Sequence, residues 1–210
     1  MNKTSRHDAW SAGDSYEVYM GRWSRSIASR FLDWLDAPPE QDWLEVGCGS
    51  GALSSKILAR CQPRSVVGLD QSEDFVRTAE NKVIDDRARF FVGDAQNIDL
   101  PDESMDYVVS ALVLNFIPDK NRALTEIRRV AKPVGTIAFY VWDYPGGGVE
   151  FMHTFWHVAV ALNPTASELA EDKRFPDCTE GRLSDLASCN GLTNVESIAI
   201  EAPAVFKSFD

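Results

Sequence analysis

The feature that most limits the possible folds is a regular alternation of short apolar runs with amphipathic segments across residues 42–142. Runs that are apolar along their whole length are typical of strands buried on both faces, and apolar residues in the segments between them recur at helical spacing. The predicted strands are 42–46, 65–69, 89–92, 107–112 and 136–142, and the predicted helices are 52–59, 73–83, the latter capped by Ser72, and 120–131. The sequence therefore predicts an α/β fold with a doubly wound, mostly parallel sheet and helices on both faces.

Further elements are predicted on both sides of this core. Apolar residues recur every four positions from Trp23 to Leu35, which predicts a helix over 23–35. After residue 142 the pattern predicts a Gly-rich loop, then helices over 149–162 and 180–190 with an irregular segment at 163–178 between them, and a sixth strand over 195–201. The insertion between the fifth and sixth strands is far longer than an ordinary connection, and long insertions are usually functional.

We therefore expect one domain over residues 1–210. Its predicted parts are an N-terminal cap and helix (1–40), a cofactor-binding core (41–143), an inserted helical lid (144–191) and a last segment with the sixth strand (192–210).

Charge and composition narrow the classes of partner. The formal net charge is −11, which repels polyanions and argues against nucleic acid or an anionic membrane as the main target. No apolar stretch is long enough to cross a bilayer, and the N-terminus lacks the apolar segment of a secretory signal. The four cysteines have neither CxxC nor zinc-ligand spacing. We expect a cytoplasmic protein with reduced thiols, a monomer or homodimer, that acts on a small molecule.

The sequence EVGCGSG at residues 45–51 joins the first predicted strand to a helix. Glycine is expensive there unless the turn needs a positive φ or a ligand approaches the backbone closely. The second predicted strand ends about twenty residues later at Asp70, where a carboxylate can bind both hydroxyls of an adenosine ribose. Dinucleotides and adenosyl methyl donors both fit these two features.

Three more features distinguish a site for an adenosyl methyl donor from a site for a dinucleotide. Glu45 lies two residues before Gly47, the third strand is followed by Gly93-Asp94-Ala95, and the fourth strand ends in Ser110-Ala111. In combination these features make residues 43–142 similar to class I S-adenosylmethionine-dependent methyltransferases, specifically the small-molecule branch related to ubiquinone-biosynthesis methyltransferases. The resemblance implies a Rossmann-like methyltransferase fold, S-adenosylmethionine as cofactor and S-adenosylhomocysteine as product.

The resemblance also implies residues that hold the methionine end of the cofactor. Glu45 would lie near its amino group, the carbonyl of Ala111 would accept from its ammonium, and Arg22 is a candidate for its carboxylate. The turn would lie against its methionine and ribose portions through Gly47, Cys48, Gly49 and Gly51.

At the adenosine end, the resemblance assigns four more residues. Asp70 would bind the ribose hydroxyls, and Gln71 would lie beside the adenine. Asp94 would accept from the exocyclic amine of the adenine, and the backbone of Ala95 would recognise the ring.

No catalytic residue is assigned from the sequence. A methyl sulfonium needs no enzyme nucleophile, and a base is needed only if the acceptor must lose a proton. The candidates for such a base are Tyr16, Tyr19, His153 and His157, and Asn115 is a candidate to face the acceptor. The two histidines are four residues apart but lack the glutamate of HExxH, so we expect no metal.

Two other functions stay open at this point. One is a nicotinamide-dependent oxidoreductase, although the chain lacks a Tyr-x-x-x-Lys pair and such a function leaves Gly93-Asp94-Ala95 unexplained. The other is a non-catalytic module that binds an adenosyl cofactor.

The chain departs from the family at its end. The family sheet has seven strands in the order 3-2-1-4-5-7-6, and this sequence stops just after the predicted sixth strand. We therefore expect that the chain is truncated, or that the missing strand is disordered or supplied by a partner.

Overall fold

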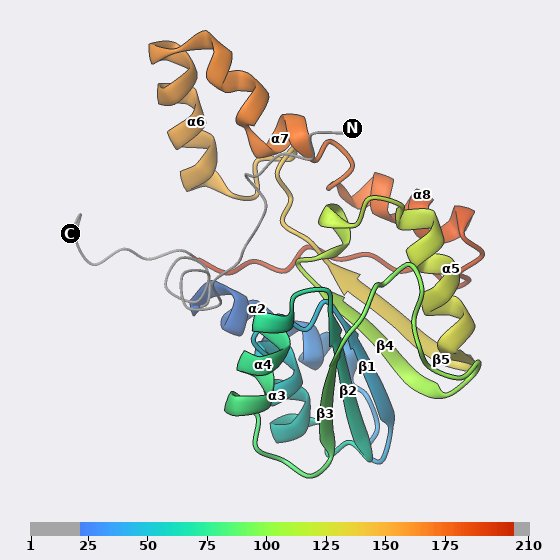
Figure 1. The fold of residues 1–210 in the computed structure, drawn as a ribbon. Helices are drawn as coiled ribbons and strands as arrows, with labels where there is room; N and C mark the ends of the chain where they lie inside the picture. The colour runs from blue at the N-terminus through green and yellow to red at the C-terminus, as the bar shows by residue number, and fades with distance from the viewer. Residues whose placement is uncertain (1–21, 204–210) are drawn as a thin grey trace.

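The structure, a computed structural model, describes residues 22–203 and is built around one parallel sheet (Figure 1). In this part of the chain the sheet has five strands in the order β3-β2-β1-β4-β5, and every neighbouring pair is parallel. The strands are β1 (Asp42–Val46), β2 (Ser65–Asp70), β3 (Ala88–Val92), β4 (Met105–Ala111) and β5 (Ala131–Tyr140). The winding reverses between β1 and β4, and such a reversal opens a crevice at the carboxyl ends of the strands.

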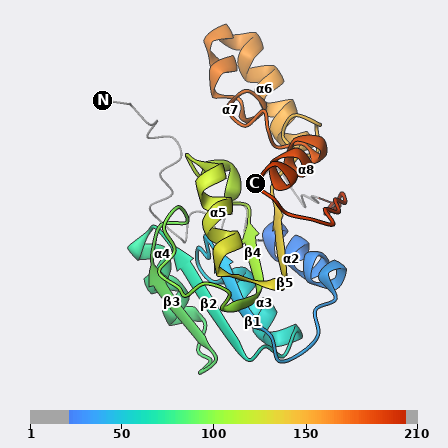
Figure 2. The same ribbon diagram turned by 90° about the vertical axis from the view of Figure 1, so that its right-hand side faces the viewer.

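Helices cover both faces of the sheet, which confirms the predicted fold class (Figure 2). One face is covered by α2 (Arg22–Leu35), α3 (Ala52–Arg60) and α4 (Glu73–Lys82). The other is covered by α5 (Lys120–Val130), which follows the short 3-10 turn η3 (Leu114–Phe116).

Neighbouring residues of the central strand fill the two halves of the core. Trp43 packs toward α2 and α3 and stacks on Tyr107 with 4.5 Å between ring centroids, whereas Leu44 packs toward α5. Both side chains are fully buried. Because side chains of a strand alternate between its faces, a strand between two helical layers is apolar along most of its length, as the sequence indicated.

Side-chain caps fix where the helices begin. The Ser72 hydroxyl accepts from the amide of Phe75 at 3.4 Å, which confirms the predicted cap of α4. The Asp119 carboxylate accepts from the amide of Arg122 at 3.0 Å and caps α5. Each cap satisfies an amide that has no partner within its own helix.

The inserted segment forms a helical arm that projects from the body (Figures 1 and 2). It contains α6 (Glu150–Leu162), the 3-10 helix η4 (Pro164–Leu169) and α7 (Glu171–Arg174). We call residues 150–174 the arm. The prediction that 163–178 is irregular is wrong for η4 and α7, because the Asn163 side chain accepts from the Thr165 amide and starts η4.

The chain returns to the body through α8 (Glu180–Cys189), next to α5. Arg128 of α5 donates to the carbonyl of Asn190 at 3.1 Å, and Gly191 follows the helix with a φ of 79°. The predicted helix over 180–190 with a glycine stop is thus confirmed. Within residues 22–203, no helix combines the length and the apolar character that crossing a bilayer requires.

The predicted sixth strand over 195–201 is wrong. Residues 195–203 have no regular secondary structure, and β5 pairs only with β4 in the described chain. Residues of β5 and of 191–200 line a common groove of about 810 Å³, and no ladder of backbone hydrogen bonds joins the two segments. Alternating apolar residues do not make a strand without a backbone partner, and Val195 and Ile198 are left 37% and 48% exposed.

Candidate functional site

A cleft of about 420 Å³ opens at the carboxyl ends of the strands, where the winding reverses. Six of the predicted cofactor-binding residues line it: Glu45, Gly47, Cys48, Gly49, Asp70 and Ala111. Ser24 and Ala28 of α2 close one side. Ligands of open α/β sheets bind in this position because loops from several strands converge there.

The glycine turn has the conformation that its sequence requires. Gly47 has a φ of 76°, and a Cβ there would lie 2.5 Å from Val113, so only glycine fits. The amides of Gly47 and Cys48 both donate to the Leu69 carbonyl, at 2.8 and 2.9 Å, and tie the turn to β2. At Gly49 an added Cβ would meet nothing, so this part of the turn presents bare backbone to the cleft.

Asp70 points toward this turn. Its Oδ2 accepts from the Gly49 amide at 3.0 Å, and its Oδ1 accepts from the Ser72 amide at 2.9 Å. Burial raises the pKa of Asp70, and the two amides oppose that rise. The carboxylate is therefore held rigidly at the cleft wall, between the turn and the start of α4.

Glu45 is a buried acid at the bottom of the cleft, 2% exposed. The Ser54 hydroxyl of α3 donates to Glu45 Oε2 at 2.5 Å. Burial raises the pKa of Glu45 to about 8, and nearby Asp70 adds to the rise. Glu45 is consequently protonated at neutral pH, and a cationic group placed beside it would favour its ionised form.

Cys48 is a buried thiol rather than a nucleophile. Burial raises the pKa of its thiol, with Glu45 and Asp70 adding to the rise, so the thiolate is disfavoured. The side chain is 4% exposed and fills space beside the glycine turn. All four cysteines of the chain are free.

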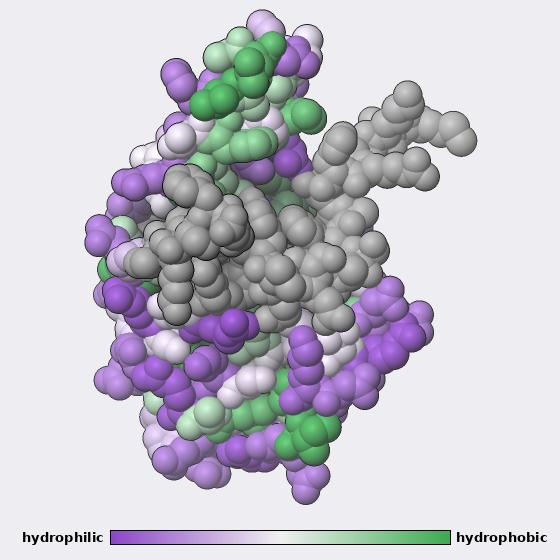
Figure 3. Space-filling view, turned by 90° about the vertical axis from the view of Figure 1, so that its left-hand side faces the viewer, coloured by the Kyte–Doolittle hydropathy of each residue, from purple (hydrophilic) through white to green (hydrophobic). Residues whose placement is uncertain are grey.

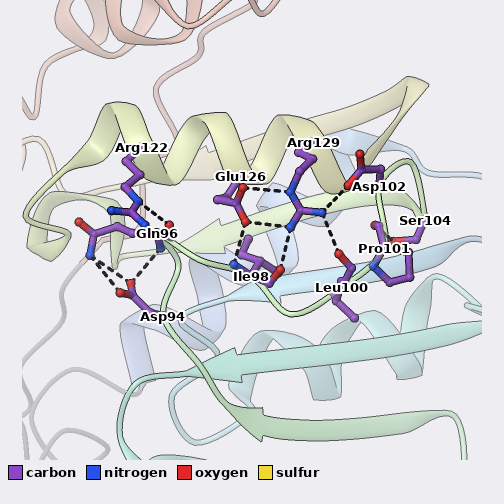
Figure 4. Close-up of polar contacts among 10 residues, drawn as sticks. All are labelled: Asp94, Gln96, Ile98, Leu100, Pro101, Asp102, Ser104, Arg122, Glu126 and Arg129. Atoms are coloured by element: carbon purple, nitrogen blue, oxygen red, sulfur yellow. Dashed lines mark hydrogen bonds and ion pairs between the residues drawn. The ribbon is translucent and has the colours of Figure 1, made fainter.

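Four predicted residues do not line the cleft. Gly51 is the N-cap of α3, where an added Cβ would lie 2.7 Å from Val83. Gln71 is exposed, and Ala95 packs beside the core of α5. Asp94 is exposed, and its Oδ1 accepts from the Gln96 amide at 2.8 Å (Figure 4). That hydrogen bond lowers the pKa of Asp94. The roles of these residues at an adenine stay predictions.

The loop that carries Asp94 is fastened to α5 (Figure 4). Arg122 donates to the Gln96 carbonyl at 2.9 Å, and Arg129 donates to the carbonyls of Ile98 and Leu100 at 2.7 and 2.8 Å. Arg129 also pairs with Glu126, which lowers the pKa of that carboxyl. The position of the loop is therefore set by guanidinium groups of α5.

The far end of the cleft is aromatic and was not found from the sequence. It is lined by Phe116, Tyr140, Trp142, Tyr144 and Phe175, with Met152, Glu171 and Arg174 of the arm. Phe116 of the body meets Phe175 edge to face, with 5.1 Å between ring centroids. The alternation Tyr140-Val-Trp142-Asp-Tyr144 was a readable signal, since it places three aromatic residues at the end of β5. For the arm, the length of the insertion indicated a functional segment but not which of its residues line the cleft.

The base and acceptor candidates lie elsewhere. His153 and His157 are exposed and line a second cavity, within the arm. Asn115 is buried and does not line the cleft, although its neighbour Phe116 does. Tyr16, Tyr19 and the Arg22 side chain lie outside the described residues. No group of three or more His, Cys, Asp or Glu side chains in residues 22–203 has the arrangement of a metal site.

Comparison with known proteins identifies the domain. The family described as a methyltransferase domain matches residues 44–139. The chain is 30% identical over 140 residues to a malonyl-[acyl-carrier protein] O-methyltransferase of Serratia marcescens, covering 66% of this chain and 53% of that protein. It is 34% identical over 100 residues to a ubiquinone/menaquinone biosynthesis C-methyltransferase of Rickettsia massiliae, covering 44% of this chain and 40% of that protein. The chain thus spans about half or less of the length of these relatives.

Solved structures share the fold. An S-adenosyl-L-methionine-dependent methyltransferase of Methanococcus maripaludis superposes with a TM-score of 0.66 at 21% identity, over 90% of this chain and 85% of that one. A Haloferax volcanii protein, solved in complex with a methyltransferase activator, has a TM-score of 0.66 at 21% identity over 95% and 84% of the two chains. At such identities the likeness shows the fold alone. Residues 44–139 thus match a methyltransferase domain, and the described chain shares its fold with solved S-adenosylmethionine-dependent methyltransferases.

Proposed function

We propose that this protein transfers a methyl group from S-adenosylmethionine to a small-molecule acceptor. The observation that carries the proposal is the Asp70 carboxylate, fixed by the amides of Gly49 and Ser72 at the wall of the cleft. A ribose beside the bare backbone of Gly49 would find this carboxylate in place, without any rearrangement of the turn.

The residues present fit such a cofactor. Gly49 leaves space at the turn, Asp70 offers an acceptor for hydroxyls, and Glu45 offers a carboxyl that a nearby ammonium would ionise. S-adenosylmethionine supplies an activated methyl group with a neutral leaving group. The protein then has to orient the acceptor and exclude water, and the aromatic end of the cleft is suited to both tasks.

A small-molecule acceptor is favoured by charge and by the shape of the cleft. The net charge of −11 disfavours nucleic acid, and the aromatic end of the cleft lies between the sheet and the arm. The two relatives named above differ in their printed acceptors, so they do not identify the acceptor here. We further propose that the protein is cytoplasmic and acts as a monomer or homodimer.

Binding of S-adenosylhomocysteine by calorimetry tests the proposal. We expect Asp70→Ala to weaken binding by at least about tenfold, because a buried charge-assisted hydrogen bond to the ribose is lost. Asp74→Ala is the matched control, since Asp74 is an exposed acid of α4 paired with Arg77. Equal affinity of Asp70→Ala and wild type would sink the proposal. So would tight binding of a nicotinamide cofactor with none of S-adenosylhomocysteine.

A further inference from the structure

The arm contains a second, open pocket of about 450 Å³, lined by α6 on one side and by η4 and α7 on the other. We call it the arm pocket. Its lining residues on α6 follow a single helical stripe in which the apolar residues Met152, Trp156, Val160 and Ala161 are interleaved with His153 and His157. Ala170, between η4 and α7, faces them. The volume lies within the range of roughly 300–1,000 Å³ that is usual for small-molecule sites.

The arm pocket adjoins the aromatic end of the cleft. Tyr144, Met152 and Glu171 line both cavities, so the boundary between them consists of these three side chains. The indole Nε1 of Trp156 donates to Glu171 Oε2. This hydrogen bond holds the indole ring of Trp156, which forms part of the apolar wall of the arm pocket, against Glu171 at the boundary.

The stripe of α6 is only partly covered by other side chains of the described chain, and Met152, Trp156 and Val160 are half-buried. No residue of α6 is buried, although the helix has no charged residue after Glu150. An apolar wall that lines an unfilled pocket forgoes both dispersion contacts and the gain from excluding water. A ligand with an apolar portion of matching size would recover both.

We propose that the arm pocket is the specificity site for an apolar arm of the methyl acceptor, an alkyl chain or a second ring, while the reactive polar end lies in the cleft. The acceptor is then an amphiphilic molecule that crosses the boundary at Met152. This inference rests on the proposed function, because only a methyltransferase would have a methyl acceptor as its ligand. The affinity of the arm pocket for apolar groups can be measured whether or not the protein transfers methyl groups.

A series of phenols serves as the probe. Phenol, 4-butylphenol and 4-hexylphenol are titrated into the protein by calorimetry, with and without saturating S-adenosylhomocysteine. We expect affinity to rise with chain length, by up to about fourfold for each methylene that becomes buried. Equal affinity across the series would overturn the proposal.

Two variants of α6 locate the binding. Ala161→Phe introduces a ring at a residue that lines the arm pocket, whereas Val158→Phe introduces the same ring at a residue of α6 that does not line it and is 53% exposed. We expect Ala161→Phe to abolish the gain with chain length and Val158→Phe to retain it. Equal behaviour of the two variants would place binding elsewhere and overturn the proposal. Val160→Ala, which removes part of the wall, is expected to reduce the gain and provides a second test if Ala161→Phe does not fold.

S-adenosylhomocysteine binding separates this proposal from the proposed function. If S-adenosylhomocysteine binds but the alkyl series shows no gain, the arm pocket is excluded and the proposed function stands. If S-adenosylhomocysteine does not bind but the alkyl series retains a gain sensitive to Ala161→Phe, the proposed function fails and the arm pocket stands.

Discussion

At the scale of single residues, Glu45 determines how the site responds to pH. Burial raises its pKa from 4.5 to about 8, so the folded protein holds a proton that the unfolded chain releases at neutral pH. The unfolded state binds fewer protons than the folded state between these two values. The contribution of Glu45 to stability is therefore full below about pH 4.5 and is lost as the pH rises to about 8.

We expect Glu45→Gln to flatten this pH dependence. A neutral amide matches the protonated acid in shape, so the free energy of unfolding of the variant should fall less than that of wild type between pH 5 and 8. Urea unfolding at several pH values measures both slopes. Glu73→Gln, an exposed change at the start of α4, is the control. Parallel slopes for wild type and Glu45→Gln would contradict the raised pKa.

Ligand binding should also move this proton. If the cofactor's ammonium lies beside Glu45, binding S-adenosylhomocysteine at neutral pH ionises the carboxyl and releases a proton. Calorimetry in two buffers of different ionisation enthalpy would then give different apparent binding enthalpies, and Glu45→Gln should remove most of the difference. No difference for wild type would place the ammonium elsewhere.

At the scale of elements, the loop between β3 and β4 depends on one arginine. Arg129 donates to two loop carbonyls and pairs with Glu126 and Asp102. We expect Arg129→Met to lower the free energy of unfolding by about 1–2 kcal/mol. Most of this loss comes from the two carbonyls and the Glu126 carboxylate that lose their donor, because partly exposed ion pairs contribute little. Chemical denaturation measures the change in the free energy of unfolding.

Arg77→Met is the matched control for this change. Its only ion pair among the described residues is with Asp74, and both side chains are 61% exposed, so we expect almost no loss. An equal effect of the two substitutions would show that the Arg129 network does not hold the loop.

The elements differ in how far the sequence could predict them. Strand 42–46 was predicted to the residue because its apolar residues Trp43, Leu44 and Val46 fall on both faces and a glycine turn follows it. Strand 136–142 was placed too late, since β5 begins at Ala131 and contains Pro133 and Gly135, which usually interrupt strands. Strand 195–201 failed because pairing depends on a partner edge, which a local pattern does not contain.

In the site too, features set by the local sequence could be predicted, and features that depend on contacts between distant segments could not. Glu45, Gly49 and Asp70 were predicted because each lies in or next to a strand end, and parallel strands bring those ends together. The aromatic end of the cleft joins η3, the end of β5 and the arm, which are far apart in the chain. Nothing in their local sequences reveals that they meet.

At the scale of the whole molecule, two features of the surface stand out: its net negative charge and the exposed apolar residues of the arm. Figure 3 shows hydrophobic residues gathered on the arm, and Phe155, Val158 and Leu162 of α6 are 61%, 53% and 82% exposed. The chain as a whole carries a net charge of −11. Mutual repulsion of that charge disfavours the compact state, and salt screens it over distances of about 10 Å at 0.1 M.

We therefore expect the melting temperature to rise by a few degrees as sodium chloride increases from about 10 to 150 mM. Scanning calorimetry measures the shift, and sucrose at matched osmolality controls for effects that do not depend on charge. A fall in melting temperature would mean that the surface ion pairs, such as that of Arg60 with Asp33, outweigh the general repulsion.

The way the arm joins the body has a consequence for divergence among related enzymes. Among the described residues the base of the arm contacts the rest of the molecule where Phe151 meets Trp23, and Phe175, which directly follows the arm, meets Phe116. On the proposed function, the groups that would hold the adenosyl moiety belong to a different part of the chain. Mutations in the arm would then change which acceptor is methylated and leave the donor site intact, so new substrates would arise by exchange of about twenty-five contiguous residues.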